Sequence, residues 1–157
     1  MTLYLVRHAH AGDRSAFEAD DRLRPLSPKG RAQAQGLLDR YGDRPITRVL
    51  SSPSLRCQQT VAPIARHRGL DVQICDPLDE RSPADEGIAL LRSLAGEEVI
   101  LCSHGDVIPD IMRTLIDQGF EVDGGAAASK AGVFEFETDG TNLVSAQYVG
   151  PPVLARD

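Results

Sequence analysis

The hydrophobic pattern of this chain consists of short apolar runs separated by longer stretches in which apolar residues recur every three to four positions. Residues 3–6, 46–51 and 97–103 contain runs typical of buried strands. The unbroken run 99–102 indicates burial on both faces, as in a parallel sheet. Residues 70–74 alternate apolar and polar side chains, which predicts a half-buried strand.

The stretches between these strands carry the signals of helix ends. A serine and a proline at 27–28 predict an N-cap and a first helical position, and Gly42 can end that helix. The pair 52–53 repeats the signal for a second helix. Pro63 falls inside this helix and removes one backbone hydrogen bond, which predicts a kink or an early end near Gln59.

Two more helices are expected further along the chain. Residues 82–85 form a variant of the capping box with aspartate in place of the usual Glu or Gln, and that helix can stop at Gly96. Asp106 can cap the last helix, which ends at Gly119. The Gly- and Ala-rich stretch 121–128 is predicted to be a loop.

The end of the chain predicts a β-hairpin, with strands at 133–137 and 143–149 joined by a turn. Strands that alternate with helices indicate a parallel sheet. We therefore expect an α/β fold: a single-domain three-layer α/β/α sandwich with a mostly parallel central sheet and a C-terminal hairpin. Residues 1–150 form this domain, since 157 residues are the size of one ordinary domain, and 151–157 form a short tail.

The charge balance limits the kind of partner that this chain can bind. Its formal net charge is −6, with 25% charged and 41% hydrophobic residues, as in an average globular protein. Binding a nucleic-acid polymer needs a broad basic surface, so that partner is not expected. A small phosphorylated ligand needs only a local positive pocket. The sequence does not indicate an oligomeric state.

The cysteines and the apolar runs indicate a cytoplasmic protein. The three cysteines Cys57, Cys75 and Cys102 have neither metal-binding spacing nor an even count for a disulfide framework. The first apolar run is interrupted by Arg7 too early for a signal peptide, and no run reaches a membrane-spanning length. No membrane partner is therefore expected.

Cationic and imidazole side chains follow the predicted strands where each strand ends. Arg7 and His8 follow the first strand, His104 follows the fourth, and Arg56 lies one turn into the helix after the second. Ligands bind at the carboxyl ends of strands in open α/β sheets. A cation in the first turn of a helix is disfavoured by about 0.3–1 kcal/mol, and a bound anion would reverse that sign. These four side chains are therefore expected to line one anion pocket.

Three motifs in this order resemble the histidine phosphatase (phosphoglycerate mutase-like) superfamily. They are Leu-Val-Arg-His at 5–8, Ser-Ser-Pro-Ser-Leu-Arg-Cys-Gln-Gln-Thr at 51–60 and Ser-His-Gly-Asp at 103–106. The short chain and residues 24–30 are most similar to the phosphohistidine phosphatase SixA branch. Residues 105–110 also resemble the phosphatase domains fused to Nudix hydrolases.

The resemblance implies a phosphoric monoester hydrolase that works through a covalent phosphohistidine. In this reading His8 accepts the phosphoryl group, while Arg7, Arg56 and His104 hold its oxygens. The nearby cations disfavour protonation of His8, so the imidazole is expected to be neutral and nucleophilic at pH 7. Glu80 matches the carboxylic acid that protonates the leaving group and then activates water.

Other residues near these motifs have more than one interpretation. Asp79 is the alternative proton donor to Glu80, and Glu80 could instead be an exposed carboxylate paired with Arg81. The resemblance places a phosphate-side arginine at Arg24, at the end of a polar loop expected to lie over the site. Lys130 is a candidate substrate-binding residue, although an exposed lysine is the more ordinary interpretation.

The chain departs from the family pattern in two places. Ala9 stands where the family usually has glycine after Arg-His, so the turn must accept a Cβ atom, which we expect to be tolerated. The segment after Arg-His lacks the asparagine and the long insertions that accompany mutases, which argues against sugar-phosphate mutase activity. His67, between two arginines, is expected on the surface.

Other functions compete with this hypothesis. The spacing of His8 and His10 resembles paired metal ligands of barrel metallohydrolases, but that fold needs about 250 residues. We therefore expect no metal and no other cofactor. A non-catalytic phosphate-binding module would keep the arginines without the chemistry. Within the enzyme hypothesis, the substrate is either a small phosphate monoester, such as a nucleotide, or a phosphohistidine protein of the SixA kind.

Overall fold

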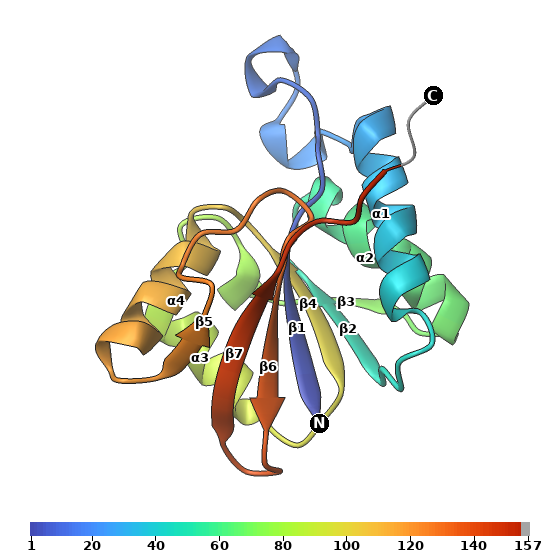
Figure 1. The fold of residues 1–157 in the computed structure, drawn as a ribbon. Coiled ribbons are helices and arrows are strands. Elements are labelled where there is room, and N and C mark those ends of the chain that lie inside the picture. The colour runs from blue at the N-terminus through green and yellow to red at the C-terminus, as the bar shows by residue number, and fades with distance from the viewer. Residues whose placement is uncertain (155–157) are drawn as a thin grey trace.

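Strand β1 (Thr2–Arg7) lies in the middle of a seven-stranded sheet with the order β3-β2-β4-β1-β6-β7-β5. The computed structural model describes residues 1–154 (Figure 1). Strands β3, β2, β4 and β1 pair in parallel, whereas β6 is antiparallel to β1 and to β7. The remaining strands are β2 (Arg48–Ser51), β3 (Val72–Ile74), β4 (Val99–Ser103), β5 (Glu121–Asp123), β6 (Val133–Thr138) and β7 (Leu143–Val149).

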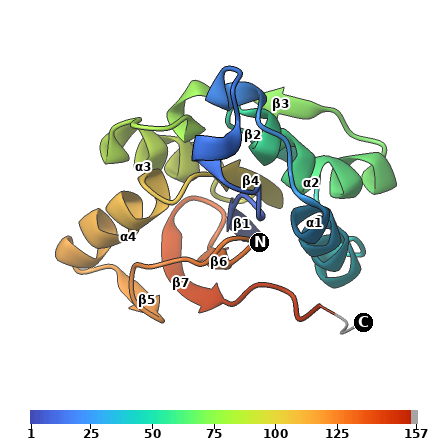
Figure 2. The same ribbon diagram turned by 90° about the horizontal axis from the view of Figure 1, so that it is seen from above.

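Four helices cover the two faces of this sheet. They are α1 (Pro28–Tyr41), α2 (Leu55–Arg68), α3 (Ala84–Ser93) and α4 (Val107–Asp117). Seen from above, α1 and α2 lie on one side of the strands and α3 and α4 on the other (Figure 2). The expected three-layer α/β/α architecture with a mostly parallel sheet is confirmed.

Alternation along the central strands divides the core into two. In β1, Leu3 and Leu5 pack with α3 and α4, while Tyr4 and Val6 pack with α1 and α2. All five residues of β4 are buried, as the unbroken apolar run predicted. Both faces of the central strands β1 and β4 are therefore covered, which fixes their register because a one-residue slip would exchange the two sets of side chains.

Helix α2 differs from the prediction at its start and in its middle. The expected cap at 52–53 is wrong, since the helix begins at Leu55 after Ser54, whose side chain makes no capping hydrogen bond. The early end near Gln59 is also wrong. The helix continues through Pro63 to Arg68 because Val61, Ile64 and other side chains of the same face are buried against the sheet.

The ends of α1 and α4 follow the prediction, whereas α3 differs at both ends, since it stops at Ser93 and not at Gly96. Ser27 caps α1 by accepting a hydrogen bond from the Gly30 amide, and Asp106 caps α4 by accepting one from Val107. The predicted capping box of α3 is wrong, because Pro83 takes the N-cap position and Ser82 Oγ donates to the carbonyl oxygen of Asp76 instead.

The edges of the sheet were predicted less well than its centre. The expected loop 121–128 begins with the edge strand β5, which pairs with β7 over only three residues. Ile74, expected to point inward, is 48% exposed in the edge strand β3. The hairpin β6–β7 is confirmed. Of the predicted tail 151–157, the last three residues lie outside the described part of the chain.

Within residues 1–154, no helix is long and apolar enough to cross a lipid bilayer.

The two-sided core predicts a large penalty for truncating β4. Replacing Leu101, which is fully buried, with alanine should lower the free energy of unfolding by about 2–5 kcal/mol in a urea titration. The matched substitution Val144→Ala, at a side chain that is 52% exposed in β7, should change it by less than about 0.5 kcal/mol. Equal losses in the two variants would contradict the assigned core.

Candidate active site

The parallel pairing of β1 with β4 places the two histidine motifs side by side. Arg7 is in register with Ser103, and the backbone amide of His8 donates to the Ser103 carbonyl oxygen at 3.0 Å. The rings of His8 and His104 follow directly, with centroids 5.5 Å apart and planes at 67°. The predicted convergence of the two histidines is therefore confirmed.

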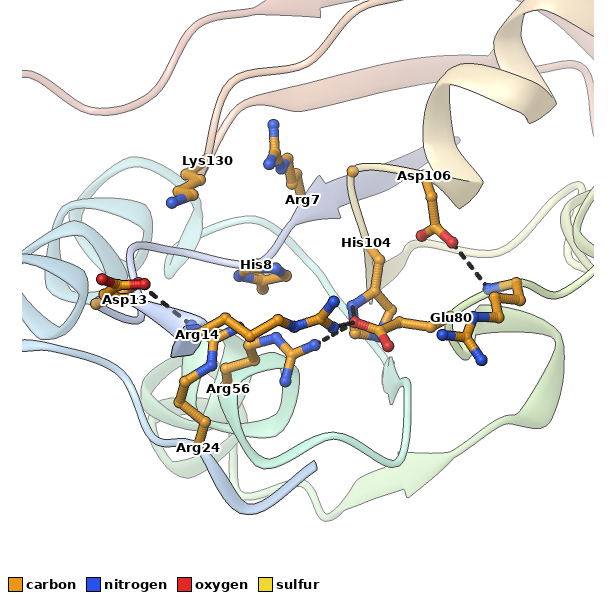
Figure 3. Close-up of a pocket in the computed structure, with 13 residues that line it drawn as sticks. Arg7, His8, Asp13, Arg14, Arg24, Arg56, Glu80, His104, Asp106 and Lys130 are labelled. Carbon is orange, nitrogen blue, oxygen red and sulfur yellow. Dashed lines mark hydrogen bonds and ion pairs between the residues drawn. The ribbon is translucent and has the colours of Figure 1, made fainter. Parts of the chain in front are cut away.

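A cleft of about 430 Å³ opens above these strand ends (Figure 3). It contains the predicted residues Arg7, His8, Arg24, Arg56, Glu80, His104 and Lys130. Its other lining residues are Gly12, Asp13, Arg14, Arg81, Gly105 and Asp106. The lining thus holds six cationic side chains and three carboxylates, in a chain whose net charge is −6. Such a local excess of positive charge favours a small anionic ligand.

His8 is held in one tautomer by the backbone of the residue that follows it. Its Nδ1 lies 2.8 Å from the carbonyl oxygen of Ala9, which can only accept, so Nδ1 is the donor and Nε2 keeps the lone pair. Burial lowers the pKa of His8 to about 3, and the charges of His104, Arg56 and Arg7 add to that effect. The expected neutral imidazole is supported, although burial and not the cations is the larger cause.

The turn after His8 accepts alanine without strain. Ala9 is fully buried, and its amide donates to Thr60 Oγ1 at 3.0 Å. Among the described residues, Arg81 and Ala131 are the non-glycine residues with positive φ, so Ala9 needs no left-handed conformation. The departure from the family pattern at this position is therefore tolerated, as expected.

Arg56 is the most deeply buried cation of the cleft, with an exposure of 1%. Its Nη1 donates to the carbonyl oxygen of Asp21, and its Nη2 forms ion pairs with the carboxylates of Glu80 and Asp21. These two carboxylates offset both the burial of the guanidinium and its position in the first turn of α2. From the sequence we predict that Arg56, in the first turn of a helix, needs a nearby anion. The sequence does not show that the protein's own carboxylates supply part of that negative charge.

Arg7 is fixed against the turn that follows β4. Its Nη1 donates to the carbonyl oxygen of Ala128 at 2.8 Å. A Cβ atom built on Gly105 would lie 2.6 Å from Arg7 Cζ, so a side chain at this position would push the guanidinium out of its place. The glycine in the motif at 103–106 therefore allows the observed placement of Arg7.

Three buried nitrogens of the predicted phosphate ligands have no hydrogen-bond partner among the described residues. They are Arg7 Nε, Arg56 Nε and His104 Nδ1. Leaving a buried donor without a partner costs about 1–3 kcal/mol, more for charged groups. Phosphate oxygens accept hydrogen bonds from such groups, so the chemistry of these nitrogens fits a phosphoryl ligand.

His104 is oriented by a residue that the sequence analysis missed. Ser52 Oγ forms a 2.7 Å hydrogen bond with His104 Nε2, and Cys57 Sγ lies 3.5 Å from the same nitrogen. Nδ1 is therefore the nitrogen left for a ligand, and it lies 3.5 Å from Glu80 Oε1. Ser52 and Pro53 also fit the start of a helix, so nothing in the sequence indicates a contact between Ser52 and His104.

Glu80 faces the cleft between two arginines. It pairs with Arg56 and accepts from Arg14 Nη2 at 3.0 Å, so the alternative ion pair with Arg81 is wrong. Asp79 is outside the cleft lining, where it pairs with Arg22 at 2.6 Å. This geometry favours Glu80 over Asp79 as the proton donor, because Glu80 lines the cleft together with His8 and His104 and Asp79 does not.

The polar segment 12–24 folds over the cleft as predicted. It contains two short turns, at Arg14–Ala16 and Asp21–Leu23. Arg24 is buried and donates to the carbonyl oxygen of Ala11 and to the carboxylate of Asp21. Arg14 and Asp21 were not predicted, because ion pairs across 35 or 66 residues leave no local pattern in the sequence.

Lys130 is half-buried in the wall of the cleft, so the interpretation as an ordinary exposed lysine is wrong. Burial lowers its pKa, and the charges of Arg7 and Arg24 act in the same direction. It therefore remains a candidate for substrate binding. His67 lies on the surface as expected, with a side chain that is 50% exposed.

The metal alternative receives no support from the side-chain geometry. His10 is absent from the cleft lining, and its Nδ1 hydrogen-bonds with Ser27 Oγ at 2.6 Å, at the start of α1. Within residues 1–154, no three His, Cys, Asp or Glu side chains are grouped as a metal site. The two histidines after β1 thus serve different structural purposes.

The lowered pKa of His8 predicts a specific pH dependence of stability. The unfolded chain protonates this residue near its ordinary value of 6.5, whereas the folded protein does so only near 3. The contribution to stability is therefore complete above pH 6.5 and is lost as the pH falls towards 3. Between pH 6.5 and 4, this protonation should make the free energy of unfolding fall by up to about 1.4 kcal/mol per pH unit. The variant His8→Asn should remove that part of the slope in urea titrations.

The matched control is His67→Asn, at the exposed histidine of α2, which should leave the slope unchanged. NMR of the imidazole ring provides an independent measurement, with the His8 signals expected in the neutral form at pH 5. Protonation of His8 with a midpoint near pH 6.5 would contradict the assigned environment.

Comparison with known proteins agrees with this geometry. The family model of the histidine phosphatase superfamily (branch 1) matches residues 3–86. The 8-oxo-(d)GTP phosphatase of Mycolicibacterium smegmatis is 33% identical over 158 residues, which cover 96% of this chain and 48% of that protein. The chain thus spans about half the length of this curated relative.

Solved structures share the fold over nearly the whole chain. The histidine phosphatase SixA complexed with tungstate superposes with a TM-score of 0.69 at 20% identity, covering 97% of this chain and 96% of that one. The putative SixA of Agrobacterium tumefaciens gives 0.71 at 24% identity, covering 96% and 97%. With the family model matching more than half of its residues, the chain belongs to the histidine phosphatase superfamily.

Proposed function

We propose that this chain is a phosphoric monoester hydrolase that transfers a phosphoryl group from a small phosphate ester to His8 and then to water. The observation that carries the proposal is the buried, neutral His8, whose Nε2 lone pair borders the cationic cleft. Neutral imidazole is a nucleophile when its other nitrogen donates to a fixed acceptor.

Arg7, Arg56 and His104 hold the phosphoryl oxygens in this mechanism. Charge in the transition state spreads over these oxygens, so catalysis depends mainly on position and on charge neutralisation. At ~4 Å and an effective dielectric constant of ~20, each unit charge pair contributes an attraction of ~4 kcal/mol. Planar guanidinium groups add two-point hydrogen bonding, which a lysine at either position could not supply.

The first chemical step forms a bond between His8 Nε2 and phosphorus and breaks the bond from phosphorus to the ester oxygen. Glu80, as the acid, gives its proton to that oxygen. In the second step Glu80 takes a proton from water, whose oxygen attacks phosphorus. The P–N bond breaks, and inorganic phosphate and neutral His8 are released. Both steps use Arg7, Arg56 and His104 for charge and need no metal ion, so turnover should persist in the presence of a chelator.

A nucleoside phosphate is the small ester that we place first. The M. smegmatis relative is named for action on 8-oxo-(d)GTP, and this chain is 33% identical to about half of it. A carboxylic acid beside the site also suits an ester, because an alkoxide leaving group needs a proton. A phosphohistidine protein is the alternative substrate, since protonated imidazole leaves without help from Glu80.

Removal of the nucleophile tests the reaction. His8→Asn should lower turnover of p-nitrophenyl phosphate by more than about 10³-fold and abolish the acid-labile phosphoenzyme seen after rapid quenching with labelled substrate. The control His67→Asn should match the wild type. Wild-type protein that binds phosphate but turns over neither an ester nor a phosphohistidine protein would identify a binding module instead.

Glu80→Gln tests the acid and the substrate class together. Single-turnover transfer of the phosphoryl group from a nucleoside monophosphate to His8 should slow by about 10²–10⁴-fold, because glutamine cannot donate the proton, while the same transfer from a phosphohistidine protein is spared. Asp79→Asn provides the matched control and should leave nucleotide hydrolysis within about threefold of the wild type. The opposite result for these two variants would transfer the acid role to Asp79.

A further inference from the structure

The loop that carries Glu80 is tied to the turn that carries His104 at two points. Before Glu80, the buried Ser103 Oγ donates to the Leu78 carbonyl oxygen at 2.7 Å. After Glu80, the Arg81 amide donates to Asp106 Oδ2 at 2.9 Å (Figure 3). Along the chain, one tether therefore lies before Glu80 and one after it, and the partners of the two tethers likewise lie before and after His104.

The second tether holds an unusual backbone conformation. Arg81 has φ of 64°, in the left-handed region that a residue with a Cβ atom seldom adopts without support. Because Arg81 follows Glu80 directly, its backbone sets the direction in which the chain leaves the acid. The hydrogen bond to Asp106 is the contact that stabilises the Arg81 amide in this geometry.

Asp106 is itself held by the helix that follows. Its Oδ1 accepts a hydrogen bond from the Val107 amide at 2.9 Å, as the N-cap of α4, and leaves Oδ2 for Arg81. Val107 and Ile108 are buried in the core, so the start of α4 is a rigid support. Capping the helix requires one oxygen, and only a side chain with a second acceptor can also hold Arg81.

We propose that Asp106 is a positioning residue, which together with Ser103 holds the Glu80 carboxyl group in register with His104. This inference rests on the proposed function, in which Glu80 protonates the leaving group beside a phosphoryl group bound by His104. The 3.5 Å separation of Glu80 Oε1 and His104 Nδ1 is the geometry that the two tethers maintain. Asp106 acts through the Arg81 backbone and not on the reacting atoms.

Leaving-group dependence separates this role from a general effect on folding or phosphate binding. Asp106→Ser keeps a helix-capping oxygen but loses the second acceptor. For an alkyl phosphate, whose leaving group needs a proton, single-turnover formation of the phosphoenzyme should slow by about 10–100-fold. For p-nitrophenyl phosphate, whose leaving group is stable as an anion, it should slow by less than about threefold.

The control is Asp110→Ser, which removes a carboxylate from the exposed side of the same first helical turn and should affect neither ester. In a Glu80→Gln background, Asp106→Ser should slow the alkyl ester by less than about twofold more, since the acid that it positions is already absent. If Asp106→Ser does not fold, Asp106→Asn serves as the second variant. It keeps the shape of the side chain but has one acceptor oxygen instead of two.

Equal slowing of both esters, or full additivity with Glu80→Gln, would overturn the inference while leaving the phosphatase proposal intact. Failure of the wild type to form a phosphoenzyme with any ester would instead refute the proposed function. In that case amide hydrogen exchange still tests the tether. Exchange at Arg81 should be at least about tenfold faster in Asp106→Ser than in Asp110→Ser, and unchanged exchange would overturn the tether itself.

Discussion

The pairing of β1 with β4 is the constraint on which the rest of the site depends. The parallel register that matches Arg7 with Ser103 brings two histidines together from positions 96 residues apart. Neither strand can slip, because both strands place alternate side chains in the two hydrophobic cores, one on each face of the sheet. The positions of the two histidines along the strands are therefore set by hydrophobic packing below the cleft, and contacts within the cleft then orient their side chains.

The cleft resolves an electrostatic problem that its composition creates. Six cationic side chains line it, and their mutual repulsion would be unfavourable without nearby carboxylates. The carboxylates of Asp21 and Glu80 supply the compensating negative charge, and both pair with the buried Arg56. In the mechanism that we propose, a phosphoryl group competes for the same guanidinium, so its binding would exchange one anionic partner for another. This exchange would free the Glu80 carboxyl group for proton transfer in the mechanism that we propose.

The sequence predicted the centre of this structure better than its periphery. Buried strands and capped helices have local signatures, and the strand ends located Arg7, His8, Arg56 and His104 correctly. Short edge strands such as β5 lack enough residues to show a period. Asp21 and Ser52 were missed for another reason. Their partners are distant in sequence, and each residue also fits an ordinary local role in a loop or at a helix cap.

The contact between Gly105 and Arg7 determines where this site can change its substrate range. A side chain at position 105 would displace the guanidinium, and β4 and α4 on either side are packed into the core. A substitution at Gly105, in the rear wall of the cleft, would therefore disturb the position of Arg7. The segment 12–24 on the opposite side is largely exposed and built from short turns. In the function that we propose, divergence among relatives or directed evolution towards new phosphate esters would act through the exposed residues of this segment, while Arg7, His8, Arg56 and His104 stay constant.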